Sequence, residues 1–427
     1  MPPCHDGVMS LPAGYTLLTP GPARMVDFAT TAGWAFVFEV KDEDREFTLA
    51  SVPQERARAV EITDASRGPV GELAAVYSST TYGMRVPGGG VLRTSGLTWV
   101  GVHPGHRRRG LLREMIDDHF RISLDAGEAV STLYAMETPI YGRFGYASCA
   151  PRYKLKVEGL LEVPGADDLT FRVERASKEA HESVVRAVHA RAMRPGTMAE
   201  PSATMIHELL ADRPSGRYTS GEGGTVAIVE DSHGPAGYAK FYRSLDERGS
   251  GPNPSANIHV FTMTAVTAQA SRRLLATLRD FDLVNEMWVE GVPLDDPSVA
   301  LAKDIRVCEA RLVDGLWLRI LDLPAALTAR EYSADADAVI EVTDEQLPAN
   351  AGTWRLRISG GEASLSRTDD AADIALMIQD LSAAYLGFDH FRRQQAAGLL
   401  TERTPGAVQA LHAAFTAYEA PFANLWF

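Results

Sequence analysis

Residues 97–120 read LTWVGVHPGHRRRGLLREMIDDHF and carry the clearest local signal in the chain. The opening LTWVGV is short, apolar and rich in β-branched and aromatic residues, which predicts a strand. A loop with Pro104 and Gly105 follows, and from Leu111 the apolar side chains return at helical spacing. The apolar positions are Leu111, Leu112, Met115, Ile116, His119 and Phe120, and the polar positions on the opposite side are Arg113, Glu114, Asp117, Asp118 and Arg121. The stretch therefore predicts a strand, a loop and an amphipathic helix.

The loop holds three consecutive arginines, Arg107, Arg108 and Arg109, directly before Gly110. Free backbone N–H groups in the first helical turn, together with the helix dipole, favour an anion at this end. Gly110 has no Cβ and would let such a ligand approach the backbone. The loop matches neither a P-loop nor a dinucleotide-binding glycine turn. The arginines are either a solvated basic patch or partners of a bound anion. Positive charges at a helix N-terminus interact unfavourably with the helix dipole, and this favours the second interpretation, because an anion would compensate them.

The composition of the whole chain limits its class. Its 427 residues predict two or three domains, and 45% hydrophobic with 23% charged residues indicates globular cores. A net charge of -14 disfavours nucleic acid and anionic membrane surfaces as partners. The cysteines are too few and too widely spaced for a disulfide framework or a zinc site. With no signal peptide and no apolar run of roughly 20 residues, we expect a cytoplasmic protein.

Strand and helix signals divide the chain into three units, whose bounds we expect at residues 1–150, 151–299 and 300–427. The first two units repeat one order of strands and helix, which predicts an α/β fold with a central sheet. In the second unit the corresponding loop reads VTAQASRR and has no glycine, so we expect it to bind no cofactor.

The third unit has strands followed by helices, which predicts an α+β fold. We expect its first strand at residues 315–322 and a late helix with Thr404 as N-cap and Pro405 as first residue. The buried stripe of that helix is predicted to be Val408, Leu411, Phe415 and Tyr418, and the core of the unit to include Leu376, Leu381, Tyr385 and Leu386.

The loop and helix resemble motif A of the GNAT superfamily of N-acetyltransferases, in which a Gln or Arg, two residues, Gly, one residue and Gly or Ala wrap the pyrophosphate of coenzyme A. Residues 107–112 match except at Leu112, which replaces the small residue. The longer string HRRRGLLR is similar to Eis-type (enhanced intracellular survival) acetyltransferases, where leucine is usual. The same similarity extends to IYGRFGY (140–146), DFDLVNEMWVEGVPLDDP (280–297), DGLWLRILDLPAAL (314–327) and DLSAAYLGF (380–388). The resemblance therefore covers all three units.

This resemblance implies two tandem GNAT acetyltransferase folds, the second degenerate, followed by a sterol-carrier-like α+β domain. It also implies acetyl-CoA as the cosubstrate and no metal. The strand would bind the pantetheine arm through its backbone, the loop would hold the pyrophosphate, and two residues after the fifth strand would line the cofactor. The strand residues are Val100, Gly101 and Val102. The pyrophosphate loop and helix start comprise Arg107, Arg108, Arg109, Gly110, Leu111, Leu112 and Arg113. The two residues after the fifth strand are Met136 and Glu137.

Tyr141 stands at the position of the family's general acid, which protonates the leaving thiolate of coenzyme A. A phenol with a pKa of about 10 can give a proton to a thiolate whose thiol has a pKa of about 8.5. The alternative is that Tyr141 and Phe144 only pack on a turn. We expect Tyr146 in the core.

The last residues, PFANLWF, are apolar to the end, which indicates a docked segment. In Eis-type enzymes the terminal carboxylate acts as the general base, and Phe427 agrees with that pattern. An α-carboxyl has a pKa of about 3.3–3.7, so burial or a relaying water would have to assist it. The alternative is that the tail only seals an interface. Trp426 stands where the family can carry an acidic residue.

The resemblance implies an N-acetyltransferase that acts on amino groups of cationic amines, such as aminoglycosides or lysine side chains, by direct attack on the thioester. The alternative is a lipid- or cofactor-binding module without turnover. The family also implies a homo-oligomer, a hexamer. His103, His106 and His119 are too irregularly spaced for a metal site. The identity of the amine and the residues of its pocket do not follow from the sequence.

Overall fold

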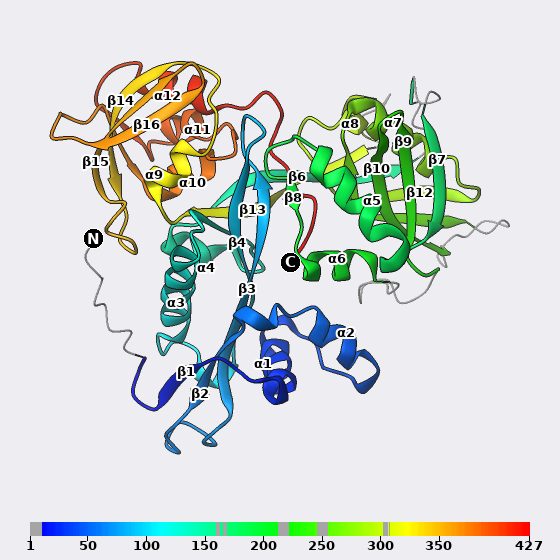
Figure 1. Ribbon diagram of the computed structural model, residues 1–427, viewed down its shortest axis with the longest axis horizontal. Coiled ribbons are helices and arrows are strands. Elements are labelled where there is room, and N and C mark those ends of the chain that lie inside the picture. Colours follow the sequence, from blue (N-terminus) through cyan, green and yellow to red (C-terminus); the bar gives the residue numbers. More distant parts are fainter. Residues whose placement is uncertain are drawn as a thin grey trace.

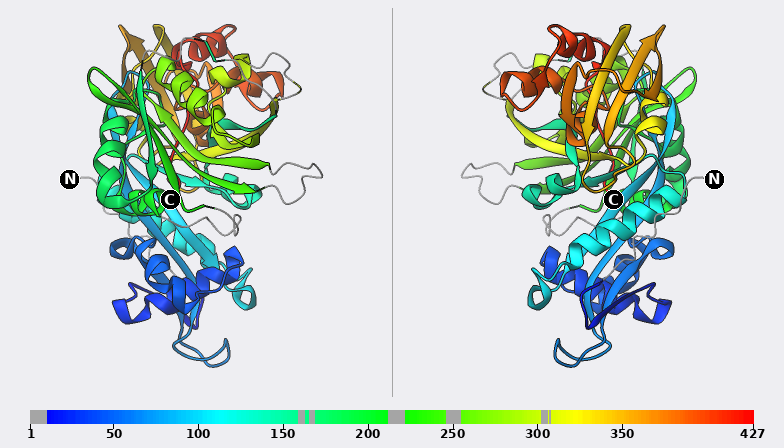
Figure 2. Two further views of the ribbon diagram at one scale, coloured as in Figure 1. Left: turned by 90° about the vertical axis from the view of Figure 1, so that its right-hand side faces the viewer. Right: turned by 90° about the vertical axis from the view of Figure 1, so that its left-hand side faces the viewer.

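A computed structural model describes residues 11–158, 163–164, 169–211, 222–245, 255–301, 306 and 308–427. The chain forms three lobes, drawn in Figure 1 in blue to cyan, in green, and in yellow to red. The C-terminal segment leaves the third lobe, passes the second and ends near the centre of the molecule (Figures 1 and 2). Within these residues no helix is both long and apolar enough to span a bilayer.

The first lobe contains the predicted strand, loop and helix as strand β4 (Val91–Val102), turn η4 (Pro104–His106) and helix α3 (Leu111–Asp125). The strands expected beside them are also present, as β3 (Leu73–Arg85) and β5 (Val130–Tyr134). Its other elements are β1 (Tyr15–Leu18), η1 (Pro22–Arg24), α1 (Met25–Phe36), η2 (Asp42–Asp44), α2 (Arg45–Ala50), η3 (Gln54–Arg56), β2 (Arg58–Ile62), α4 (Thr138–Tyr141), η5 (Gly142–Phe144) and β6 (Ala147–Glu158).

The second lobe repeats this plan. The strands and helix of the repeated order are β9 (Thr225–Asp231), β10 (Gly234–Leu245), β11 (Ala256–Ala265) and α7 (Ala268–Arg279). The other elements are β7 (Thr170–Arg175), α5 (Lys178–Arg191), β8 (Met198–Glu200), α6 (Ala203–Leu210), β12 (Val284–Val292) and α8 (Pro297–Leu301).

One sheet joins the first two lobes. In the part of the chain that the structure describes, it has 13 strands in the order β1-β2-β3-β4-β5-β13-β6-β12-β11-β10-β9-β7, and β8 pairs with β3. The pairs β4–β5 and β11–β12 are parallel, whereas the neighbouring pairs β3–β4 and β10–β11 are antiparallel. Helix α3 connects the first parallel pair and α7 the second, as a parallel crossover requires. The two lobes therefore present the same unit of strand, helix and parallel strand.

Strand β13 (Cys308–Ile320) lies in this sheet between β5 and β6. We expected residues 315–322 to form the first strand of the third unit. In the structure, residues 315–320 belong to β13 and therefore to the large sheet. Leu316, Leu318 and Ile320 are fully buried there, in a core that includes residues of all three lobes. A local reading identifies such a strand but not its partners, because pairing depends on distant segments. The domain bounds at residues 150 and 299 stay a prediction.

Helix α3 packs its apolar side on the sheet, with one correction to the predicted pattern. Asp118, expected on the solvent side, is buried, where the Tyr77 hydroxyl donates to it at 2.6 Å and Arg58 Nε at 2.9 Å. Burial alone would raise the pKa of Asp118, but hydrogen bonds from Tyr77, Arg58 and Arg121 outweigh it and lower the pKa. An ion pair of this kind keeps a buried carboxylate charged.

The third lobe is α+β, as predicted. Its sheet, in the described residues, has the strand order β16-β15-β14-β17-β18. Its elements are α9 (Leu323–Thr328), β14 (Ala336–Thr343), β15 (Gly352–Ser359), β16 (Glu362–Arg367), β17 (Ile374–Met377), α10 (Ile378–Ala384), α11 (Phe391–Ala396), β18 (Thr401–Glu402) and α12 (Ala407–Phe415). The four expected core residues, Leu376, Leu381, Tyr385 and Leu386, are buried.

The late helix of this lobe begins later than the sequence predicts. Gly406 is its N-cap, with a φ of 90°, and Thr404 instead donates its hydroxyl to Asp373 at 2.6 Å. The left-handed conformation of Gly406 turns the chain before the helix starts, so the expected cap and first residue lie outside it. Tyr418 lies beyond the helix end and is fully exposed, not part of the buried stripe.

Candidate active site

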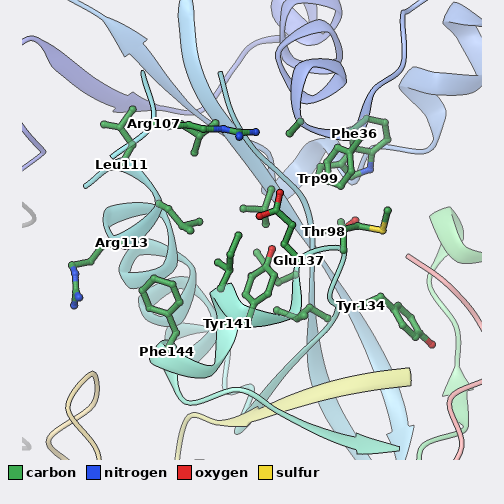
Figure 3. A pocket seen from close by; sticks show the side chains of 18 of the residues that line it. Phe36, Thr98, Trp99, Arg107, Leu111, Arg113, Tyr134, Glu137, Tyr141 and Phe144 are labelled. Carbon is green, nitrogen blue, oxygen red and sulfur yellow. The ribbon is translucent and has the colours of Figure 1, made fainter. Parts of the chain in front are cut away.

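A cavity of about 620 Å³ opens where strands β4 and β5 separate. The two strands pair from Thr94 to Gly96 of β4, and no pair joins them beyond Gly96, although both strands are fully described. The first turn of α3 and the short helix α4 form the other walls. Figure 3 shows Thr98, Glu137 and Tyr141 around the middle of this space. The cavity therefore lies in the gap between two parallel strands, at the N-terminal end of their crossover helix.

A bulge in β4 shapes one wall. Trp99 has a φ of 56°, which is uncommon for a residue with a side chain, and the register between β3 and β4 shifts beside it. The indole N–H donates to the Ser51 carbonyl at 3.3 Å, and the ring packs against Phe28 and Phe38. The strained residue is thus fixed by its surroundings, as is common at functional sites.

The loop between β4 and α3 also has left-handed residues. Arg108 has a φ of 60° and Gly110, the N-cap of α3, a φ of 84°. A Cβ on Gly110 would meet nothing nearer than Pro12, at 3.8 Å. Its conformation, more than space for a ligand, is therefore the reason for glycine here. Because glycine has no capping side chain, the first N–H groups of α3 stay free to bind an anion.

The residues expected to hold coenzyme A fall into two groups. Most of them line the cavity: Val100, Val102, Arg107, Arg108, Gly110, Leu111, Leu112, Arg113, Met136 and Glu137. Two do not. Arg109 donates to the Tyr15 hydroxyl at 2.8 Å, and Gly101 faces helix α1, where a Cβ would lie 3.2 Å from Ala32. Arg109 thus ties the loop to β1, and Gly101 allows α1 to pack closely on β4.

Tyr141 ends helix α4 and lines the cavity, and its ring lies edge-on to Tyr146 with 6.0 Å between centroids. Burial raises the pKa of Tyr141 to about 12, and the nearby Glu137 carboxylate adds to the rise. The phenol therefore keeps its proton at neutral pH. Tyr146 is buried, as expected, and shares a 2.7 Å hydrogen bond with Ser131.

The last residues of the chain also line the cavity, although the sequence places them far from β4. The Phe427 ring lies on Gly96, where a Cβ would come within 2.7 Å of it, and 5.4 Å from the Tyr134 ring. The Tyr134 hydroxyl donates to the Leu425 carbonyl at 2.6 Å. The guanidinium of Arg152 lies 4.2 Å from the centre of the Trp426 ring, at cation–π distance. These contacts fix the tail in the site.

A second cavity of about 280 Å³ adjoins the first. Both cavities are lined by Phe36, Thr98, Trp99, Trp426 and Phe427. The second lobe supplies the far wall, mainly from α6 and β11. Of the described residues that line it, Glu208 alone has an ionisable acidic or basic side chain. Burial raises the pKa of Glu208, although the Ser51 hydroxyl and His207 act against the rise.

Sequence reasoning did not find several lining residues. Phe36, Tyr134 and Glu208 come from elements that carry no motif, and Trp99 was read only as part of a strand. No spacing in the sequence brings α6 to β4, because the two meet through the tertiary fold. The three histidines lie apart from any metal cluster: His106 Nδ1 bonds the Tyr15 hydroxyl at 2.9 Å, and His119 Nε2 bonds Ser131 at 2.7 Å. In the described chain no group of His, Cys, Asp and Glu could hold a metal ion.

Comparisons with known proteins agree with this architecture. Residues 24–149 and 202–320 each match an acetyltransferase (GNAT) domain family, and residues 323–424 match a sterol carrier protein domain family. An uncharacterized N-acetyltransferase of Streptomyces avermitilis is 33% identical over 386 residues, covering 89% of this chain and 91% of that protein. The N-acetyltransferase Eis of Mycobacterium tuberculosis is 32% identical over 368 residues, covering 84% of this chain and 86% of Eis.

The crystal structure of Eis1 from Mycobacterium abscessus superposes with a TM-score of 0.78 at 26% identity, covering 97% of this chain and all of that one. The fold is thus two GNAT domains followed by a sterol-carrier-like domain, as predicted. GNAT enzymes take their acyl group from acetyl-CoA, and the cavity at α3 has the anion-binding helix end and arginines that such a ligand needs. The chain therefore belongs to the Eis-type N-acetyltransferases of the GNAT superfamily and is an acetyl-CoA-dependent acyltransferase.

Proposed function

We propose that this enzyme transfers the acetyl group of acetyl-CoA to a primary amino group of a cationic amine by direct attack. The observation that carries the proposal is that Tyr141 and Phe427, which are far apart in the sequence, line one cavity. The amine nitrogen bonds to the thioester carbonyl carbon and the carbon–sulfur bond breaks. The nitrogen loses one proton and the sulfur gains one, so the step needs a base and an acid.

Coenzyme A would lie along the larger cavity. The pyrophosphate would bind the free N–H groups of α3 together with Arg107, Arg108 and Arg113, which line this part. The pantetheine arm would lie against the part of β4 that does not pair with β5, from Thr98 to Val102. Met136 and Glu137 would line the opposite side. Each of these assignments is supported by the position of the residue at the cavity, and those of Arg107 and Arg108 also by the match of residues 107–112 to the family motif.

Tyr141 would act as the general acid. Its raised pKa, about 12, keeps the phenol protonated until the thiolate forms. A proton donor that loses its proton only in strong base puts no basic limb on the rate below about pH 10. The hydroxyl would therefore be ready to protonate sulfur across the working range of the enzyme.

The carboxylate of Phe427 would act as the general base, directly or through a water. The Phe427 residue lines both cavities and thus stands where the amine and the thioester would meet. Its position is supported by the contacts of its ring with Gly96 and Tyr134.

The smaller cavity would hold the amine, with Glu208 near its ammonium group. Aminoglycosides and lysine side chains are the candidates to which the family resemblance points. The aromatic lining, which includes Phe38 and Phe261, would pack the apolar part of the amine. Trp426 occupies the position where relatives can carry an acid, so this site offers less negative charge to a polycation.

We also propose that the enzyme works in the cytoplasm as a homo-oligomer, a hexamer by resemblance to its relatives. Sedimentation of the purified full chain tests the oligomeric state. A single species of six-chain mass supports the hexamer, and a monomer across the assay concentrations overturns it.

The acid and base assignments are tested by two changes, Tyr141→Phe and a single glycine added after Phe427. Each should lower kcat by roughly 100-fold or more, because general acid–base catalysis contributes about 10²- to 10⁴-fold. Thiol release from acetyl-CoA is the readout, and calorimetry should show unchanged coenzyme A binding. Tyr146→Phe is the matched control, since its hydroxyl bonds Ser131 in the core. Wild-type turnover in both variants would remove the assigned acid and base.

A further inference from the structure

The C-terminal tail reaches the cavity of the first lobe by way of the second lobe. The Ala420 N–H donates to Asp295 at 2.9 Å, and Arg194 donates to the Ala420 carbonyl at 2.7 Å. The Phe422 N–H donates to the Pro195 carbonyl at 2.8 Å. The tail is therefore bound to the second lobe through its backbone before it enters the site.

The groove that holds the tail is the counterpart, in the second lobe, of the coenzyme A cavity. Pairing between β11 and β12 ends at Val260, as pairing between β4 and β5 ends at Gly96. A cavity of about 180 Å³ lies beyond this point at the start of α7, lined by Thr267, the N-cap of that helix, and by Phe422 and Asn424 of the tail. Tail residues thus occupy the place that corresponds to the cofactor site.

Asn424 makes the densest contacts in this groove. Its Nδ2 donates to Thr264 Oγ1 at 2.7 Å, and the Thr262 hydroxyl donates to its carbonyl oxygen at 2.5 Å. Both threonines belong to β11, in the segment beyond Val260 that no longer pairs with β12. Asn424 is 5% exposed and both threonines are buried, so water cannot replace these bonds easily.

A buried histidine supports the same asparagine. His189 lies fully buried on α5, with its Nδ1 2.6 Å from the Met198 carbonyl and its Nε2 3.3 Å from Asn424 Nδ2. Because the carbonyl can only accept, Nδ1 carries the proton and Nε2 is an acceptor in the neutral ring. Nε2 also accepts from the Tyr238 hydroxyl at 2.9 Å, so the Asn424 amide shares its acceptor on α5 and has Thr264 Oγ1 as its closer acceptor on β11.

We propose that Asn424 is a positioning residue for catalysis, through which Thr262 and Thr264 of the second lobe set the place of the Phe427 carboxylate in the first. The proposal rests on the base role of Phe427 given above. Asn424 precedes Phe427 by three residues, and the Leu425 carbonyl between them is held by Tyr134. Only Leu425 and Trp426 separate Asn424 from Phe427, so a shift at Asn424 moves the terminal carboxylate relative to the amine.

The test removes one hydroxyl that is remote from the reaction. Thr264→Val should lower kcat about tenfold, because small displacements of a catalytic group reduce rates strongly, while the KM for acetyl-CoA stays unchanged. Thr264→Ser keeps the hydroxyl and should restore kcat. Thr277→Val is the matched control, since that buried hydroxyl bonds Arg273 within α7 and does not contact the tail. Thermal unfolding of each variant shows that the compared samples are folded.

A second readout separates positioning from a general loss of structure. A strongly basic amine must give up two protons, one before it attacks and one as the amide forms, whereas an amine that is neutral at the assay pH gives up only the second. A misplaced base therefore matters most for the strongly basic amine and least for the neutral one. The loss in Thr264→Val should therefore shrink towards twofold with a weakly basic amine, and also as the pH rises. An equal loss with every amine at every pH would overturn the proposal.

The outcomes distinguish this inference from the proposed function. If the chain extended past Phe427 is inactive but Thr264→Val turns over like the wild type, the base role stands and the positioning role of Asn424 fails. If the extended chain is fully active, the base role itself fails. A tenfold loss in Thr264→Val that Thr264→Ser reverses, together with an inactive extended chain, supports both.

Discussion

The first and second lobes share one arrangement of strand, helix and parallel strand, but they differ at the start of the helix. In the first lobe, residues 103–110 separate β4 from α3, and the N-cap is Gly110. In the second, residues 266–267 separate β11 from α7, and the Thr267 hydroxyl accepts a hydrogen bond from the Ala270 N–H at 3.1 Å. One helix end is thus left open to a ligand, and the other is closed by its own residue.

This difference shows where binding capacity lies in the fold. The sheet and the crossover helix are the same in both lobes, so they do not by themselves make a cofactor site. The first lobe differs by its longer loop, with three arginines and left-handed residues, where we propose that the anion binds. In the second lobe the corresponding gap holds the C-terminal tail. On one scaffold, the second gap therefore holds the chain's own tail, and the first is the gap that we propose for coenzyme A.

The largest expected effect comes from Gly110. In Gly110→Val a β-branched residue must adopt a φ of 84°, which costs about 1–2 kcal/mol and displaces the loop. We expect coenzyme A binding, measured by calorimetry, to weaken by up to about 30-fold. The control in the second lobe is Gly234→Val, because Gly234 has a φ of 101° and open space around it. Equal losses of coenzyme A affinity in both variants would contradict the assigned site.

Each of the first two lobes has a buried histidine, so the effect of pH on the stability of the two lobes can be compared. Burial lowers the pKa of His119, in the first lobe, to about 3, with Arg56 adding to the shift. Burial likewise lowers the pKa of His189, in the second, to about 4, against the opposing hydrogen bond to Met198. The unfolded chain binds these protons near pH 6.5, so stability is full above that pH and is lost as the pH falls.

Each histidine should remove about 1.4 kcal/mol of unfolding free energy per pH unit below 6.5, or about 2 kcal/mol at pH 5. His119→Asn and His189→Asn should each flatten the dependence of the unfolding temperature on pH between 6.5 and 4. Between pH 4 and 3 only the His119 variant should still differ in slope from the wild type. Unchanged slopes would mean that these rings are protonated in the folded protein.

Two arginines of the loop in the first lobe should differ in their effect on coenzyme A binding. Arg108 lines the cavity, whereas Arg109 is bound to Tyr15. Arg108→Ala should weaken coenzyme A binding about tenfold, because a hydrogen bond to a charged group contributes about 1.5–3 kcal/mol. Arg109→Ala should change it less than Arg108→Ala. Calorimetry at two salt concentrations checks this, and the reverse order would show that the arginines exchange roles when the ligand binds.

The smallest effect is expected at the closed helix of the second lobe. Thr267→Ala removes the cap of α7 and should lower stability by about 1 kcal/mol. Coenzyme A affinity should not change, because no cofactor is expected there. Thermal unfolding and calorimetry on the same sample check both statements. A weaker coenzyme A complex would show that the second lobe takes part in binding.

The sequence predicted the local elements well where a strong pattern exists. The amphipathic repeat gave helix α3 and the apolar runs gave β9, β10 and β11, because side-chain periodicity is a local property. Thr404 was expected to cap a helix that Gly406 begins, because a cap depends on the backbone conformation as well as on residue type. Asp118 was placed on the solvent side, since its partner Arg58 is distant in the chain.

Most cavity residues that the sequence assigned lie between β4 and the first turn of α3, or between β5 and the end of α4. The residues of the smaller cavity, proposed for the amine, could not be identified in this way. Glu208 of α6 and Phe36 of α1 line one cavity only because of the tertiary packing. The route of the tail was equally hidden. Asn424 carries no motif, and its partners Thr262 and Thr264 are ordinary strand residues.

The position of β13 affects how the protein can be made. When the first lobe leaves the ribosome, β5 and β6 have no strand between them, and that strand is synthesised only after the second lobe. Unpaired strand edges invite aggregation, and contacts between distant segments form slowly. A fragment that ends after β6, at residue 158, would therefore expose the edges of β5 and β6 that β13 otherwise covers, and expression of the lobes one by one is a poor route to crystals or assays. The nascent enzyme should depend on chaperones until β13 arrives.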